Sequence, residues 1–514
     1  MSAVLGSTPD LPTPAPRKGR WTRRVIAGSA GVLLVGGLTA AGFGARWYLH
    51  TGAQPAEALP SSTLAYLAVD LDPSGKQKLA AKGVLDKLPI AKSDDLGGVG
   101  DLRKEIVDKL LSSGSCSGKS YEHDVKPWLG ERAAVAMVKV DDGPQPVLVL
   151  QSNDDGKADK GLQALSECGG SDFGGWDVRD GWIVWTEKKE YADAVVDAAK
   201  NGTLADDPAY KDMVDEAGGT GLVTGYVAPS AIRTLVSSFA LESPLPAGMV
   251  QQLADRVPSI ALTVRAEGGE VRADVVATLP KDNPTTPASV EPALADLPAG
   301  SSAVLAVRPS EGMSSAAFKS AFDAGLSSSI PDPAERRQAD QFFRRTLGAP
   351  IETVLQDVLD GTLVAVLGPT TADDFGRSPD QLPIAARLTP AADRKDRVLG
   401  YFEKLSRQLG LDQWAEVSGD SIVAGTSPDA RAKALSGGGL TGSARFRSVI
   451  DLDGHDVSSL LYVDLHSGLV TAALEQGLVG EPKALENLKK LSAIGLAGWL
   501  QDGKAHAQLR IALD

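Results

Sequence analysis

Two carboxylates near the start of the chain have a spacing that could support chemistry. Asp70 and Asp72 flank Leu71 at the end of a strand that we predict over residues 64–71. Alternate positions of a strand face the same side, so the two side chains could bind Ca²⁺ or act as an acid/base pair. A strand-ending turn, in which Asp accepts backbone N–H bonds, explains the same residues. We favour the turn.

A second acidic group lies near the C-terminus, where Asp451, Asp453 and Asp456 surround Gly454. Alternating acids before a glycine are found in calcium loops, but the bidentate Glu and the helical flanks of an EF-hand are missing. We therefore predict a solvated loop and no metal site. The five histidines have no metal-binding spacing, and no glycine-rich stretch has the context of a phosphate loop, so no cofactor is predicted.

Two cysteines, Cys116 and Cys168, are the only thiols of the chain. Outside the cytoplasm, such a pair is more often a disulfide than two free thiols. A nucleophilic Cys116 is the alternative, but the sequence marks no partner base for it. We predict a disulfide.

Three tryptophans cluster around one predicted hairpin: Trp176, Trp182 and Trp185. If they were exposed, their rings could stack on sugars of a cell envelope. If they were buried, they would form the bulky core of a domain that is otherwise poor in aromatics. We favour the core.

The N-terminal region has the features of a membrane anchor. Residues 25–45 hold no charged side chain, and a helix of this length spans about 31 Å, close to the thickness of a bilayer's hydrocarbon core. Five basic residues precede this stretch, which predicts a cytoplasmic N-terminus, an extracytoplasmic C-terminal domain and contact with the lipid bilayer through the helix. A cleaved signal peptide is the alternative, and the length favours an uncleaved anchor of a single-pass protein in the cell membrane.

The net charge of −14 is unevenly distributed, because the N-terminal 24 residues hold five basic side chains and one acidic one. The rest of the chain is therefore strongly acidic and would repel phosphate backbones, so we expect no nucleic-acid partner.

Comparison of the chain with itself predicts a tandem repeat. The run at 59–69 returns at 297–307, Tyr226-Val227 returns at Tyr462-Val463, and the last hairpin of each copy also recurs, at offsets of 238, 236 and 234 residues. The second copy has Arg308 where the first has Asp70, which argues against a duplicated metal site. The predicted organisation is a disordered basic cytoplasmic tail (1–24), a transmembrane helix (25–48), ectodomain repeat 1 (57–280), a Pro-rich linker (281–294) and ectodomain repeat 2 (295–514).

Within each copy, alternating strand patterns are interspersed with helical ones. The fold class that we predict is α+β: the N-terminal transmembrane helix, then two tandem copies of an α+β unit with a mainly antiparallel sheet and helices packed on it. Asp180-Gly181 between two strand patterns predicts a tight hairpin.

Two motifs resemble a known family. The runs at 57–73 and 124–132, the latter containing Lys126-Pro127-Trp128-Leu129-Gly130, are similar to those of the actinobacterial domain-of-unknown-function family 3352. The resemblance implies a membrane-tethered extracytoplasmic protein and no particular activity.

No reactive constellation is visible in the sequence, so we expect a non-enzymatic binding or scaffold module of the bacterial cell envelope, with an unknown envelope protein or ligand as its partner. The alternative is an envelope hydrolase whose catalytic carboxylates converge only in the fold.

Overall fold

The computed structural model describes residues 53–70, 103–104, 107–108, 116, 118–140, 143–169, 173–229, 231, 259–267, 270–279, 288–309, 333–377, 381–410, 414–475 and 490–513.

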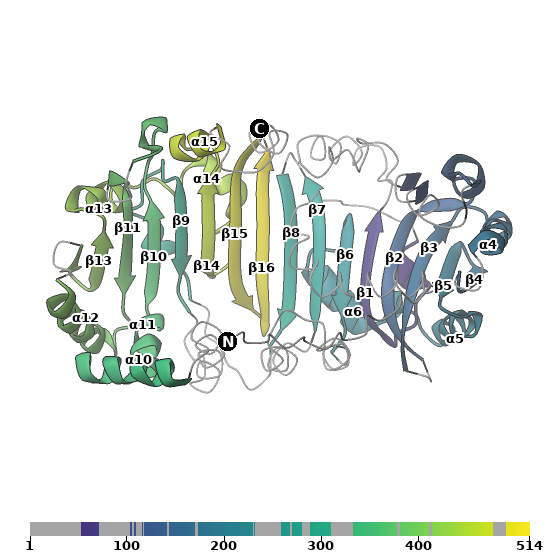
Figure 1. Cartoon of the computed structure of the whole chain (residues 1–514), viewed down its shortest axis with the longest axis horizontal. Helices are drawn as coiled ribbons and strands as arrows, with labels where there is room; N and C mark the ends of the chain where they lie inside the picture. The colour runs from purple at the N-terminus through teal and green to yellow at the C-terminus, as the bar shows by residue number, and fades with distance from the viewer. Residues whose placement is uncertain are drawn as a thin grey trace, which may run out of the picture.

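Sixteen strands form one antiparallel sheet that runs through the whole molecule (Figure 1). The strands of the N-terminal half are β1 (Thr63–Asp70), β2 (Leu129–Val140), β3 (Gly143–Ser152), β4 (Gly175–Arg179), β5 (Trp182–Thr186), β6 (Val223–Val227), β7 (Ile260–Glu267) and β8 (Glu270–Thr278). Those of the C-terminal half are β9 (Ala303–Val307), β10 (Thr362–Leu367), β11 (Ile384–Thr389), β12 (Ala415–Ser418), β13 (Ser421–Gly425), β14 (Val457–Asp464), β15 (Leu491–Gln501) and β16 (Lys504–Leu513).

The two halves have the same strand order. From the outer edge to the centre, the N-terminal half reads β4-β5-β3-β2-β1-β6-β7-β8, and the C-terminal half reads β12-β13-β11-β10-β9-β14-β15-β16. This is the arrangement that a tandem repeat requires. The domain boundaries and the linker remain predictions.

The predicted fold class, with two separate α+β units, is wrong. β8 and β16 pair along nine residues, from Lys504 opposite Thr278 to Ala512 opposite Glu270. The last strand of each half therefore continues the sheet of the other half. A backbone ladder joins the two halves at these two strands.

Most of the helices lie toward the two outer ends of the strand order (Figure 1). The α-helices are α4 (Asp155–Gly169), α5 (Lys189–Ala199), α6 (Pro208–Glu216), α10 (Pro333–Thr346), α11 (Ile351–Leu359), α12 (Lys395–Leu409), α13 (Pro428–Leu435), α14 (Ala444–Val449) and α15 (Gly468–Glu475). Short helical turns are η1 (Pro55–Glu57), η3 (Tyr121–Val125), η5 (Leu204–Asp206), η6 (Glu291–Leu294) and η7 (Ala372–Asp374). α4 and α5 contact the β4 end of the sheet, and α13 contacts β11 and β13 near the other end.

Each half has its own apolar core on the sheet. Tyr66 and Tyr226 anchor the core of the N-terminal half, and Phe446 and Tyr462 anchor that of the C-terminal half. A third cluster, which includes Leu162 of α4 and Ile183 of β5, holds the outer end of the N-terminal half together. Most other members of these clusters are Ala, Val and Leu, as expected for a chain with few aromatic residues.

The prediction of a single-pass membrane protein is also wrong. In the part of the chain that the structure describes, no helix combines the length and the apolar composition needed to cross a bilayer. Residues 1–24 and 25–48, on which the predictions of a tail and an anchor depended, lie outside the described residues.

Candidate binding groove beside strand β4

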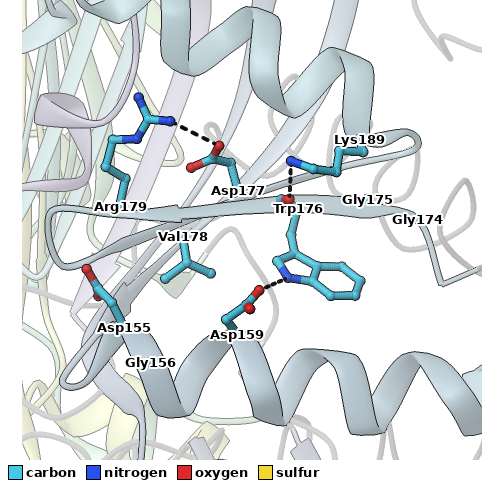
Figure 2. A pocket seen from close by; sticks show the side chains of 10 residues that line it. All are labelled: Asp155, Gly156, Asp159, Gly174, Gly175, Trp176, Asp177, Val178, Arg179 and Lys189. Atoms are coloured by element: carbon cyan, nitrogen blue, oxygen red, sulfur yellow. Dashed lines mark hydrogen bonds and ion pairs between the residues drawn. The ribbon is translucent and has the colours of Figure 1, made fainter.

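A cavity of about 660 Å³ lies beside β4, the last strand at one end of the sheet. Figure 2 shows β4 crossing the site with α4 running alongside it. The lining residues come from α4, from β4 and the two glycines at its start, and from the first residue of α5: Asp155, Gly156, Asp159, Gly174, Gly175, Trp176, Asp177, Val178, Arg179 and Lys189. We call this cavity the β4 groove.

The hairpin of β4 and β5 determines which backbone groups face the groove. Asp180 and Gly181 form its two-residue turn with φ of +53° and +81°, the left-handed conformation that such tight turns need. Arg179 and Trp182 close the hairpin as a directly opposed pair. Hydrogen-bonded and non-bonded pairs alternate along an antiparallel ladder, so the N–H and C=O groups of Trp176 and Val178 point away from β5.

A side-chain contact supports this assignment. The Lys189 ammonium donates to the Trp176 carbonyl oxygen at 3.5 Å, from the side of β4 opposite to β5. β4 pairs with no strand on that side among the described residues. The β4 groove is therefore bounded by an open strand edge, which can accept a further strand.

Packing of the two helices fixes the walls of the groove. Asp154 caps α4 by accepting a hydrogen bond from the Lys157 N–H at 3.0 Å, and Ala158 and Leu162 are fully buried. α5 approaches β4 so closely that a Cβ atom added at Gly175 would collide with the Lys189 backbone. A glycine is therefore required where the strand enters the groove.

The α4 wall is acidic. Asp159 accepts a hydrogen bond from Trp176 Nε1 at 3.0 Å, and Asp155 accepts one from the Gly181 N–H at 3.1 Å. In the described part of the chain neither carboxylate forms an ion pair. A carboxylate accepts up to about four hydrogen bonds, so both have capacity left for a ligand.

The opposite wall carries cations that are already paired. Arg179 contacts Asp177 at 3.3 Å, and Lys189 contacts Asp193 at 2.6 Å. The hydrogen bond to Asp193 is the main cause that raises the pKa of Lys189, so this side chain is charged at neutral pH. The groove thus has one wall with unpaired negative charge and one whose positive charges are neutralised.

The tryptophans contribute mainly to the core. Trp182 is buried, and Trp176 and Trp185 are half-buried against Phe173, with ring centroids 5.6 and 4.6 Å from it. Trp185 Nε1 donates to the Phe173 carbonyl oxygen at 2.8 Å. The rings do not form an exposed platform for sugars, which agrees with the core interpretation.

Cys116 and Cys168 form a disulfide, with Cα atoms 5.2 Å apart. The bond ties Cys116 to the C-terminal end of α4. No free thiol is present, so the alternative of a nucleophilic Cys116 does not apply.

Among the described residues, the acidic side chains found in the sequence do not converge on a site. Asp70 ends β1, where its N–H donates to the Leu222 carbonyl oxygen at 3.0 Å, and Asp72 lies outside the described residues. Asp451 pairs with Arg510 at 3.1 Å and accepts from the Asp453 N–H at 3.1 Å.

Asp453 and Asp456 are exposed, in the loop before β14. Among the described residues, no group of three or more His, Cys, Asp or Glu side chains could hold a metal ion.

Two histidines form a stack that their spacing did not reveal. His455 and His506 each stack on the Trp499 ring, with centroid distances of 4.5 and 5.2 Å. Burial lowers the pKa of His506, and the nearby Glu216 carboxylate opposes this only in part.

Sequence reasoning missed the β4 groove because its parts are separated along the chain. The turn Asp180-Gly181 was expected, but its proximity to α4 was not. One feature of the sequence could have indicated the groove. Residues 175–179 form a short strand pattern with alternating apolar residues, and glycines lie on both sides of it.

Comparisons with known proteins give little guidance. No family model matches the chain, and no curated protein matches it. Two crystal structures of TP0453, crystal forms III and I, are similar to 46% and 45% of this chain over 84% and 81% of their own length, at 12% and 11% identity and TM-scores of 0.23 and 0.22. This similarity is too low to support an argument. The resemblance to the family of unknown function remains a prediction.

Proposed function

We propose that this protein is an extracytoplasmic binding module that captures an extended segment of another polypeptide along β4. What supports the proposal is the open edge of this strand, which lies between α4 and α5 with the backbone groups of Trp176 and Val178 directed outward. In strand addition, main-chain hydrogen bonds supply affinity, and pockets for alternate side chains supply specificity.

The location outside the cytoplasm is part of the proposal. Its support is the disulfide between Cys116 and Cys168, since such bonds persist mainly in oxidising compartments. Alkylation of protein taken directly from cells under non-reducing conditions tests it. Two alkylated cysteines would contradict this location, and none would agree with it.

Hydrogen exchange tests strand addition. The probe is a soluble peptide, Ser-Thr-Val-Gln-Val-Thr-Ser, together with versions in which basic or acidic residues replace the alternate ones. Binding should slow exchange of the Trp176 and Val178 amides in the full chain, because these donors then face the added strand. Amides of β12, the short strand at the other edge of the sheet, serve as an internal reference.

One pair of variants separates backbone pairing from side-chain contact. Val178→Pro removes the outward N–H without removing a hydrogen bond to β5, a position at which an edge strand tolerates proline. Val178→Ala keeps this N–H and changes only the side chain. Val178→Pro should lose peptide binding while Val178→Ala retains it, provided that circular dichroism shows both to be folded. If no peptide binds, or if folded Val178→Pro binds as wild type does, the proposed function is wrong.

A further inference from the structure

The side chains of the β4 groove also indicate which kind of extended segment fits it. We infer that the groove selects a strand with two basic residues separated by one other residue, and that Asp155 and Asp159 are the residues that determine this specificity. This inference rests on the proposed function, and it adds the chemical class of the ligand.

The orientation of the β4 side chains determines which side of a bound strand faces α4. The side chains of Trp176 and Val178 point toward α4, whereas those of Asp177 and Arg179 lie on the other side of β4 (Figure 2). Residues of an added strand that stand opposite Trp176 and Val178 point to the same face as these two. Every second residue of the ligand therefore faces the acidic wall.

The two carboxylates of the α4 wall have nearly the spacing of alternate residues in a strand. Asp155 and Asp159 are four residues apart on α4, so they lie on one side of the helix, separated by about 6 Å along its axis. Alternate residues of a strand are separated by about 6.6 Å. Because α4 runs alongside β4, the two carboxylates match two successive positions on the α4 side of an added strand (Figure 2).

Each carboxylate lies beside one residue of β4 and would attract a basic side chain of the ligand there. Asp155 lies near the turn of the hairpin, where it accepts from the Gly181 N–H, and Asp159 lies near Trp176. A lysine or arginine opposite Val178 would thus approach Asp155, and one opposite Trp176 would approach Asp159. An acidic residue at either position would meet unpaired negative charge and be rejected.

A comparison of three peptides tests this inference on the full chain. They are Ser-Thr-Lys-Val-Lys-Thr-Ser, the same peptide with Gln for both Lys, and the same peptide with Glu for both Lys, each with a fluorescent label and measured by anisotropy. At low ionic strength, the basic peptide should bind about tenfold more tightly than the neutral one, and the acidic peptide should bind most weakly. The preference should shrink at 0.5 M salt, because exposed charges are then screened.

Variants that keep the fold locate the preference. Asp155→Asn and Asp159→Asn retain an oxygen that can accept from the Gly181 N–H and from Trp176 Nε1. Each should weaken binding of the basic peptide about three- to fivefold and leave the neutral peptide unchanged. Asp154→Asn is the matched control: it removes the same charge one residue outside the groove and retains a good helix cap, so it should change neither.

The outcomes distinguish the two proposals. If the basic and neutral peptides bind equally, and binding still protects the Trp176 and Val178 amides, the charge selection is wrong and strand addition stands. If the two variants weaken both peptides alike, the carboxylates act through the fold, and the inference is again wrong. If no peptide binds, the proposed function itself fails.

Discussion

Asp274 and Gln508 lie directly opposite each other on β8 and β16, and the Gln508 side-chain amide donates to Asp274 Oδ1 at 2.8 Å. The two residues are separated by 234 residues, the same offset that relates the last hairpins of the two halves. They therefore occupy equivalent positions in the two halves and meet where the halves join.

The same carboxylate holds two guanidinium groups. Arg265 contacts Asp274 and also donates to the carbonyl oxygens of Ala217 and Gly218, and Arg272 contacts Asp274 at 2.8 Å. The side chains of Arg265 and Asp274 are only 5% and 8% exposed. Asp274 thus joins a buried charge in the N-terminal half to a polar group of the C-terminal half.

We expect Asp274→Asn to lower the free energy of unfolding by about 3–5 kcal/mol, because it removes the buried carboxylate that pairs with Arg265. Urea denaturation followed by circular dichroism measures this. Asp453→Asn, in an exposed loop, should change stability by no more than about 0.5 kcal/mol. Equal effects of the two substitutions would show that the buried pair does not stabilise the junction.

The disulfide should contribute about 4 kcal/mol, because it closes a loop of 52 residues in the unfolded chain. We expect the double variant Cys116→Ser and Cys168→Ser to unfold at a correspondingly lower denaturant concentration. Adding reductant to the wild type should reproduce the loss, and adding it to the double variant should change nothing. A wild type that is insensitive to reductant under unfolding conditions would contradict the expectation.

Stability should depend on pH through His506. Burial lowers its pKa in the folded state, so above the unfolded pKa of about 6.5 both states are neutral and the group has no effect. As the pH falls below this value, the unfolded state binds a proton first and the folded state loses stability. Charged and titratable groups around His506 are Glu216, Lys504, His455 and Asp274.

His506→Gln should therefore reduce the loss of stability between pH 7.5 and pH 5.5. Denaturant unfolding at the two pH values, for the wild type and the variant, measures the difference. His123→Gln, at an exposed position on η3, should leave the wild-type dependence intact. A steeper dependence in His506→Gln would mean that the sign is wrong.

Two glycines of the β4 groove should respond in opposite ways to alanine. A Cβ at Gly175 would collide with the Lys189 backbone, so Gly175→Ala should cost about 1–3 kcal/mol. A Cβ at Gly156 would meet only Asp154 Oδ1 at 3.6 Å, an ordinary contact, and Gly156→Ala should stabilise α4 by up to about 1 kcal/mol. Denaturation midpoints compare them, and a tolerated Gly175→Ala would show that α5 adjusts easily.

Local features of the sequence determined several elements of this fold. Asp180-Gly181 specified a hairpin because few residues adopt the backbone angles of a two-residue turn. The turn at Gly503 likewise specified the hairpin of β15 and β16. A repeating apolar pattern specified the helix at Ile351–Leu359. The matching order of strand and hairpin patterns along the two halves was also visible in the sequence alone.

The tertiary structure alone decided how these elements combine. Pairing between β8 and β16 joins residues more than 200 positions apart, and the local pattern of either strand does not distinguish this central position from the edge of a separate sheet. The β4 groove likewise requires α4, β4 and α5 to meet at one open edge. The periodicity of a sequence shows which face of an element is apolar, but it does not show which distant element covers that face. The sequence therefore predicted two separate units, whereas the structure has one continuous sheet.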